Sequence, residues 1–233
     1  MGKVVHIIPV ESNKDKIIES IKTSGYPIHK AYLVLSKSAS QELEEKRRKV
    51  AEDVEVLLKA LIDVEKIYVD EFDVYGSAIE ILKVIKKEMR EGCEVLINAS
   101  DSPRNVCIAC YVAAQISKSR LYTALPKYGN GSEVGIGKII EVPVPPLKRI
   151  GEDKIDIIKV IEQEGGEVES INKLIEILEG KIEDHKMYMA QRARMSYHLN
   201  GLEEDGIIIT KREGKNVRII LTDLGKAYAV MLD

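Results

Sequence analysis

Hydrophobic residues in the first half of the chain follow two alternating patterns. Short runs of consecutive apolar residues predict buried strands, and longer segments with apolar residues every three or four positions predict amphipathic helices. The predicted strands are residues 4–10, 31–35, 67–69, 94–99 and 121–125, and the predicted helices are residues 14–23, 41–61, 75–91 and 106–117. This strict alternation predicts an α/β fold, a Rossmann-like parallel sheet covered by helices on both faces.

The polar loop after the fourth predicted strand is the centre of the candidate site. In such sheets ligands bind at the carboxyl ends of the strands, where we expect the loops after the first and fourth strands to meet. The helix that follows should present N–H groups and a positive dipole end to an anion such as phosphate. We expect Ser102 to cap this helix, Pro103 to be its first residue and Arg104 to bind phosphate oxygens. Taken alone, these residues would more often form an ordinary capped turn, and the surrounding sheet pattern favours a site.

The candidate ligand-binding residues are Pro9, Val10, Glu11, Ser12, Asn13, Asn98, Ala99, Ser100, Asp101, Ser102, Arg104 and Asn105.

The pattern changes after the fifth predicted strand. A glycine-rich segment followed by a strand at residues 138–144 is expected to form an antiparallel extension. A Pro-rich stretch at residues 142–146 then makes a stiff connection. The sequence therefore predicts two domains, residues 1–146 and 152–233.

The second domain has the pattern of a winged helix-turn-helix. Three helical segments begin near residues 153, 170 and 185, and a hairpin over residues 207–221 precedes a last helix at residues 224–232. In such domains the third helix enters the major groove and the hairpin wing contacts phosphates. Residues 186–218 hold seven Lys or Arg against four acids, whereas residues 152–184 hold four Lys against eleven acids. The candidate contacts to double-stranded DNA are Lys186, Gln191, Arg192, Arg194, Tyr197, Lys211, Arg212, Lys215 and Arg218.

Composition narrows the class of protein further. A net charge of −3 excludes a uniformly basic nucleic-acid binder, so a local patch must meet DNA. No signal peptide and no long apolar run are present, so we expect a cytoplasmic protein without a membrane span. The charged residues 44–49 alternate in sign at helical spacing, which predicts a solvated helix face. We expect no cofactor, no metal and no catalytic residue.

Two stretches carry a family resemblance. Residues 196–208, the basic hairpin and residues 221–225 resemble the winged-helix end of archaeal and bacterial transcription regulators. The first 145 residues resemble the CRISPR-associated Rossmann fold (CARF), in which Asn98-x-Ser100-x-x-x-Arg104 matches the second ligand motif. The resemblance implies a homodimer that binds a cyclic oligoadenylate, foremost cyclic tetra-adenylate, between its two copies. Asp101 departs from this motif, because its negative charge would repel phosphate.

Two alternatives stay open. Some CARF domains are ring nucleases that cleave their cyclic nucleotide, but neither predicted loop holds a His that could act as a base. His6 falls within a strand and is expected to be structural. The Cys107-x-x-Cys110 spacing would place two thiols on one helix face for metal or redox chemistry, yet no second Cys pair accompanies it, and buried packing is the preferred interpretation. A ligand-responsive transcription regulator is the favoured function.

Overall fold

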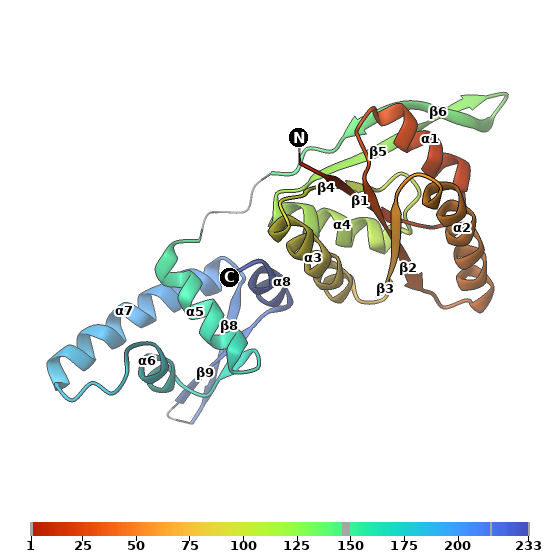
Figure 1. Cartoon of the computed structure of the whole chain (residues 1–233). Helices are drawn as coiled ribbons and strands as arrows, with labels where there is room; N and C mark the ends of the chain where they lie inside the picture. Colours follow the sequence, from red (N-terminus) through yellow and green to blue (C-terminus); the bar gives the residue numbers. More distant parts are fainter. Residues whose placement is uncertain (1, 146–149, 215, 233) are drawn as a thin grey trace. The chain divides into compact units, whose positions relative to one another are not determined.

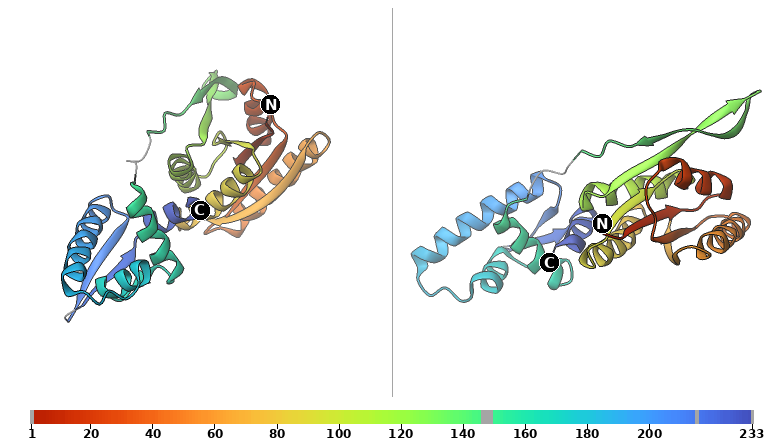
Figure 2. Two further views of the ribbon diagram at one scale, coloured as in Figure 1. Left: turned by 60° about the vertical axis from the view of Figure 1, so that its left-hand side comes forward. Right: turned by 45° about the horizontal axis from the view of Figure 1, so that its top comes forward.

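The computed structural model describes residues 2–145, 150–214 and 216–232. Pro146 of the predicted linker and Lys215 of the predicted DNA contacts lie outside the described residues. The chain divides into two compact units, residues 1–146 and 147–233. Figure 1 labels the elements of both units, and Figure 2 shows each from two further sides.

A six-stranded sheet forms the centre of the first unit. In order across the sheet, its strands are β3 (Asp63–Asp70), β2 (Lys30–Lys37), β1 (Val4–Pro9), β4 (Glu94–Asn98), β5 (Arg120–Gly129) and β6 (Ser132–Glu141). The first five are parallel, and β6 pairs antiparallel with β5. The predicted Rossmann-like α/β fold is confirmed. The strand order reverses between β1 and β4, so the loops that follow these two strands are neighbours at the carboxyl edge.

Helices cover both faces of this sheet (Figure 1). They are α1 (Lys14–Ser24), α2 (Gln41–Lys59), α3 (Val74–Arg90) and α4 (Arg104–Ser117). On one face, Ile17 of α1 and Val54 of α2 are fully buried in a core that includes Ile8 and Leu33 of the sheet. On the other face α3 and α4 pack against each other. The helix periodicity in the sequence identified most of the buried faces, but Leu57 and Leu61, which the pattern also placed inward, are 51% and 85% exposed.

The glycine-rich segment is itself part of a hairpin. The strand predicted at residues 138–144 begins earlier, at Ser132, and ends at Glu141. Asn130 and Gly131 have φ values of 51° and 79°, so they form a tight two-residue turn from which both strands pair at once. The expected antiparallel extension is confirmed, but its strand starts six residues before the predicted one.

The second unit is a winged helix. Its elements are α5 (Glu152–Gln163), β7 (Glu167–Val168), α6 (Ile171–Glu179), α7 (His185–Glu204), β8 (Ile208–Glu213), β9 (Asn216–Leu221) and α8 (Asp223–Met231). The hairpin of β8 and β9 is extended by β7 into a sheet of order β7-β9-β8. Buried apolar residues from α5, α6, α7 and the sheet share one core, which includes Ile158, Leu174, Leu199 and Ile219. The prediction missed only β7, which is too short to show a pattern.

Among the described residues, no helix has an apolar stretch long enough to cross a bilayer.

Candidate functional site

Asp101 joins the loop after β4 to the loop after β1. Its Oδ2 atom accepts hydrogen bonds from the backbone N–H groups of Glu11, Ser12 and Asn13, at 3.1, 2.9 and 2.9 Å. Three successive N–H groups that converge on one point form an anion-binding nest. In this protein a carboxylate of its own occupies that nest. The two loops that were expected to meet therefore do meet, and the N–H groups of the first loop are already engaged.

Asn98 and Ser100 lie beneath the loop, with only 1% and 5% of their surface exposed. Asn98 Oδ1 accepts hydrogen bonds from the N–H and hydroxyl groups of Ser100, at 3.1 and 2.5 Å. Asn98 Nδ2 donates to Ser20 Oγ at 2.8 Å, and the N–H of Ala124 donates to Ser100 Oγ at 3.0 Å. The other buried candidates are Pro9, Val10 and Ala99. These residues are buried under the loop, and the polar side chains of Asn98 and Ser100 form their hydrogen bonds within the protein.

The start of α4 differs from the prediction. Pro103, with φ −53° and ψ 144°, takes the N-cap position and Arg104 is the first helical residue. The predicted Ser102 cap is wrong, because Ser102 lies one residue before the cap and its hydroxyl donates to the Pro103 carbonyl at 3.1 Å. No side-chain hydrogen bond caps this helix. Its first N–H groups and its positive dipole end are therefore left to solvent or to a ligand.

Arg104 stands at this uncapped end. It is exposed, and no hydrogen bond or ion pair of its guanidinium occurs within the part of the chain that the structure describes. Its neighbour Asn105 donates from Nδ2 to the Glu71 carbonyl at 2.9 Å, which ties the start of α4 to the loop after β3. Ser12 and Asn13 are exposed on the first loop, and Asn13 caps α1 through the N–H of Lys16 at 3.0 Å. Arg104 is thus a cationic donor held beside the joined loops.

Arg47 is the exception to the prediction that residues 44–49 form a solvated face, since the other five are exposed or half-buried. It is 4% exposed, and its guanidinium lies 3.1 Å from Glu11 Oε1 and 2.9 Å from Glu71 Oε2. Its Nη1 also donates to the hydroxyl of Ser36 at 3.0 Å. The partners come from the ends of β1, β2 and β3, so only the folded sheet brings them together. Nothing in the alternating charges of α2 signals this burial.

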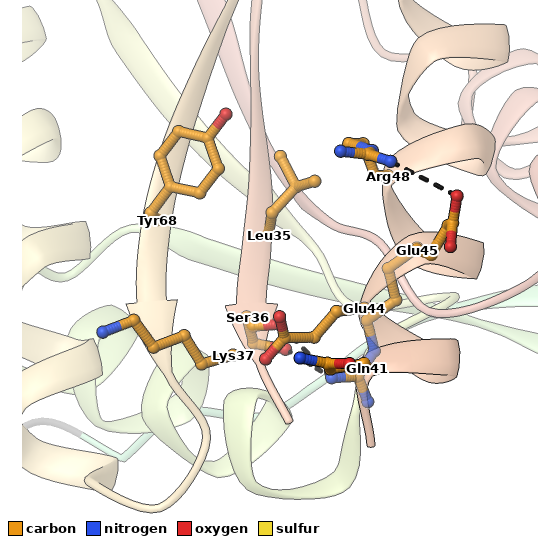
Figure 3. Close-up of a pocket in the computed structure, with 9 residues that line it drawn as sticks. Leu35, Ser36, Lys37, Gln41, Glu44, Glu45, Arg48 and Tyr68 are labelled. Carbon is orange, nitrogen blue, oxygen red and sulfur yellow. Dashed lines mark hydrogen bonds and ion pairs between the residues drawn. The ribbon is translucent and has the colours of Figure 1, made fainter. Parts of the chain in front are cut away.

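A cavity of about 360 Å³ lies between the carboxyl ends of β2 and β3 and the first turns of α2 (Figure 3). Tyr68 and Leu35 stand side by side on the two strands, facing Gln41 and the charged side chains of α2. Arg48 pairs with Glu45 at 3.4 Å. Because charges of both signs line it, this cavity offers no concentrated positive charge to a phosphate group.

The second candidate surface is α7 with the wing. Lys186, Arg192 and Tyr197 are exposed on α7, and Lys211 and Arg212 are exposed on β8.

Three other predicted contacts point elsewhere. Gln191 is half-buried and lines a cavity of about 130 Å³ with residues of α5 and α6. Arg194 Nη2 lies 3.1 Å from Asp153 Oδ1 of α5, and Arg218 Nη2 lies 3.4 Å from Glu167 Oε1 of β7. The structure thus places these three side chains against other elements of their own unit.

The remaining chemistry-bearing residues are structural. His6 is fully buried, with Nδ1 at 3.0 Å from the Tyr122 hydroxyl and Nε2 at 3.0 Å from the Pro27 carbonyl. Burial lowers the pKa of His6 from 6.5 to about 4, so the ring is neutral at pH 7. Cys110 is buried and Cys107 half-buried, and burial raises the pKa of both thiols. The buried packing expected for this Cys pair is confirmed.

Comparison with known families fits this two-unit architecture. A family model described as "HFX_2341_N:-like, N-terminal" matches residues 4–128, more than half of the chain. The chain belongs to this family. A second family model, "DUF6293 C-terminal winged helix domain", matches residues 153–233. An uncharacterized protein of Archaeoglobus fulgidus is 48% identical over 231 residues, which cover 99% of both chains. The predicted winged-helix domain after a Rossmann-like domain is confirmed.

The solved structures that match this chain share far less of its sequence than the Archaeoglobus fulgidus protein does. Protein VC1899 of Vibrio cholerae is 11% identical with a TM-score of 0.42 over 98% of this chain and 65% of its own. Can2 of Sulfobacillus thermosulfidooxidans, solved with cyclic tetra-adenylate, is 6% identical with a TM-score of 0.41 over 98% and 63%. This chain spans less than two thirds of the length of either protein. Likeness at this level says nothing about its function.

Proposed function

We propose that this protein is a DNA-binding regulator whose first domain senses a cyclic oligoadenylate-type nucleotide. The observation that carries the proposal is the position of Arg104: an exposed guanidinium, without a partner among residues 2–145, 150–214 and 216–232, at the uncapped start of α4 and beside the point where the sheet order reverses. A charge-assisted fork and free helix N–H groups suit a phosphate oxygen. The motif resemblance at Asn98, Ser100 and Arg104 makes cyclic tetra-adenylate the first ligand to test.

The DNA-binding half of the proposal rests on the winged helix. Its family match covers residues 153–233, and Lys211 and Arg212 expose positive charge on the wing. A single module with so few basic residues would bind DNA weakly at physiological salt, so we propose that a homodimer binds two half-sites. The ligand would sit between the two copies of the Arg104 loop and alter the separation of the winged helices.

A ring nuclease is the competing function, and the two predict different fates for the ligand. Cleavage needs a positioned nucleophile and a base. Ser100 is buried and bonded to Asn98, and the buried His6 ring is enclosed between Tyr122 and Pro27. We therefore propose binding without turnover.

Calorimetric titration of the full chain with cyclic tetra-adenylate tests this proposal. We expect saturable binding, recovery of the intact nucleotide by anion-exchange chromatography, and about 10- to 100-fold weaker binding by Arg104→Ala, since a hydrogen bond to a charged group contributes about 1.5–3 kcal/mol. Arg120→Ala is the matched control. Arg120 is the first residue of β5, so it lies toward the amino-terminal ends of the parallel strands, whereas Arg104 follows their carboxyl ends. Linear or shortened product would indicate a ring nuclease, and absence of binding would refute this ligand class.

A further inference from the structure

The outward face of α7 is apolar in its middle part, and exposed Asn200 and Glu204 follow on the same side toward its carboxyl end. Buried Met195, Leu199 and Leu202 define the side that packs on the core. At 100° per residue, Met189, Ala193 and Tyr197 follow one another at intervals of four on the opposite side. All three are exposed, Met189 by 49% and Tyr197 by 75%. An apolar strip of this kind is unusual on a free helix surface and indicates that something covers it.

The side chains best suited to read guanine do not lie on this strip. Arg194 is paired with Asp153 of α5, and Gln191 is half-buried in the cavity beside α5 and α6. Arg192 lies three positions before buried Met195, and therefore at the flank of the helix. Of the cations on α7, only Lys186 shares the outward face.

The charge around the strip identifies its occupant. Lys186 lies at its amino-terminal end, Arg192 lies on its flank, and Lys211 and Arg212 are exposed on β8. The side of α7 that bears Arg192 also carries Glu203, which accepts hydrogen bonds from Thr210 of β8 at 2.8 and 2.9 Å, so β8 lies beside this flank at the carboxyl-terminal end of α7. Exposed Glu204 lies on the same side as the strip at the carboxyl-terminal end of α7, so the positive charge is concentrated at the amino-terminal part of the strip and on the wing. An apolar strip with positive charge beside this part complements a major groove, where thymine methyl groups lie between two phosphate backbones. A second protein copy would instead bring the same positive charge against itself.

We infer that α7 reads A·T base pairs, with Met189 and Ala193 in contact with the C5-methyl groups of thymines. This inference rests on the proposed DNA binding and adds the feature of DNA that is recognised. Neither side chain has a hydrogen-bond donor for a base edge, so the methyl group is the only feature of a base pair in the major groove that an apolar side chain distinguishes. Tyr197 and Lys186 would contact the flanking backbone.

Replacing thymine by uracil tests the inference, because it removes the methyl group and leaves every hydrogen-bonding group of the base pair in place. Duplexes enriched by the full chain from a random library are synthesised with thymine and with uracil, and their dissociation constants are compared. We expect about fourfold weaker binding for each contacted methyl group that is lost. The same substitution in a duplex that was not enriched should leave the affinity unchanged.

A matched pair of variants assigns the effect to one face of the helix. Met189→Ala should abolish the preference for thymine over uracil. Met187→Ala should retain it, because Met187 is 60% exposed but lies two positions away and so points to a different side.

Equal affinity of the full chain for thymine and uracil duplexes would overturn the inference while leaving the proposed DNA binding intact. Absence of binding to any duplex would overturn both. Concentration-dependent self-association of the DNA-free chain that Met189→Ala abolishes would show that a second copy covers the strip, and would also overturn the inference.

Discussion

Oδ2 of Asp101 lies 2.9 Å from the backbone nitrogen of Ser12, although 89 positions separate the two residues in the chain. The same oxygen also accepts the N–H groups of Glu11 and Asn13. A carboxylate in a nest of N–H groups takes the place that a phosphate oxygen would otherwise occupy. The negative charge that looked unfavourable in the sequence therefore holds two loops together, and it would leave Arg104 as the contact for the proposed anionic ligand.

Removing this carboxylate should destabilise the first unit. Asp101→Ala leaves three N–H groups without their acceptor, so we expect the free energy of unfolding to fall by about 2 kcal/mol. Asp101→Asn keeps an acceptor oxygen and should lose less. Native-state hydrogen exchange of the β1 and β4 amides in the full chain measures this loss. Wild-type protection of these amides in Asp101→Ala would show that the nest contributes nothing to stability.

Two adjacent arginines of α2 should respond very differently to removal. Arg47→Ala leaves Glu11 and Glu71 close together without their shared cation, and we expect a loss of about 2–3 kcal/mol, the low end for a buried pair because the Glu11 side chain is 31% exposed. Arg48→Ala removes only a surface pair with Glu45 and should change stability by less than about 0.5 kcal/mol. Urea denaturation of the two variants decides the matter, and similar losses in both would contradict the assigned burial.

The wing should supply affinity without sequence preference. We expect the double variant Lys211→Ala/Arg212→Ala to weaken binding to all duplexes alike and to reduce the slope of log K against log salt by about 2, since each phosphate contact contributes about 0.9. Fluorescence anisotropy over a salt series gives this slope. Lys173→Ala on α6 is the control, because Lys173 pairs with Glu176 on its own helix. An unchanged slope in the double variant would exclude the wing from the interface.

His6 should make the first unit sensitive to acid. Its pKa is lowered from 6.5 to about 4 by burial, so the unfolded chain binds a proton more readily than the folded one between these values. Its contribution is therefore complete above its unfolded pKa of 6.5 and decreases as the pH falls toward 4. At about 1.36 kcal/mol per pKa unit, stability should fall by about 2 kcal/mol between about pH 7.5 and about pH 5.

The variant His6→Gln provides the comparison for this pH dependence. Glutamine retains hydrogen-bonding capacity toward Tyr122 and Pro27 but does not titrate. Its stability should decrease less than that of the native chain over the same range in urea denaturation. Parallel pH profiles for the two proteins would exclude His6 as the titrating group.

The sequence predicts the fold because its determinants are local or periodic. Apolar runs identify the parallel strands, and the change of pattern near residue 146 separates the two units. The loops after β1 and β4 meet as the sequence predicted, but the contacts that join them were not predicted. The helix-capping rule favoured Ser102 because of its residue type, but Pro103 remains extended and takes the N-cap position instead. The roles of Arg47 and Asp101 depend on partners 11 to 90 positions away, which no periodicity reveals.

The central claim is that a nucleotide held at Arg104 changes the affinity of the winged helices for DNA. Coupling between two such sites is expected to be about 1–3 kcal/mol, or about 5- to 150-fold in DNA affinity. The decisive measurement is the dissociation constant for an enriched duplex with and without saturating cyclic tetra-adenylate, in the native chain, Arg104→Ala and Arg120→Ala. We predict a ligand-dependent change in the native chain and in Arg120→Ala, and none in Arg104→Ala at unchanged basal affinity. A ligand effect of equal size in all three proteins would contradict a role for Arg104. The absence of any ligand effect in all three would contradict the proposed coupling.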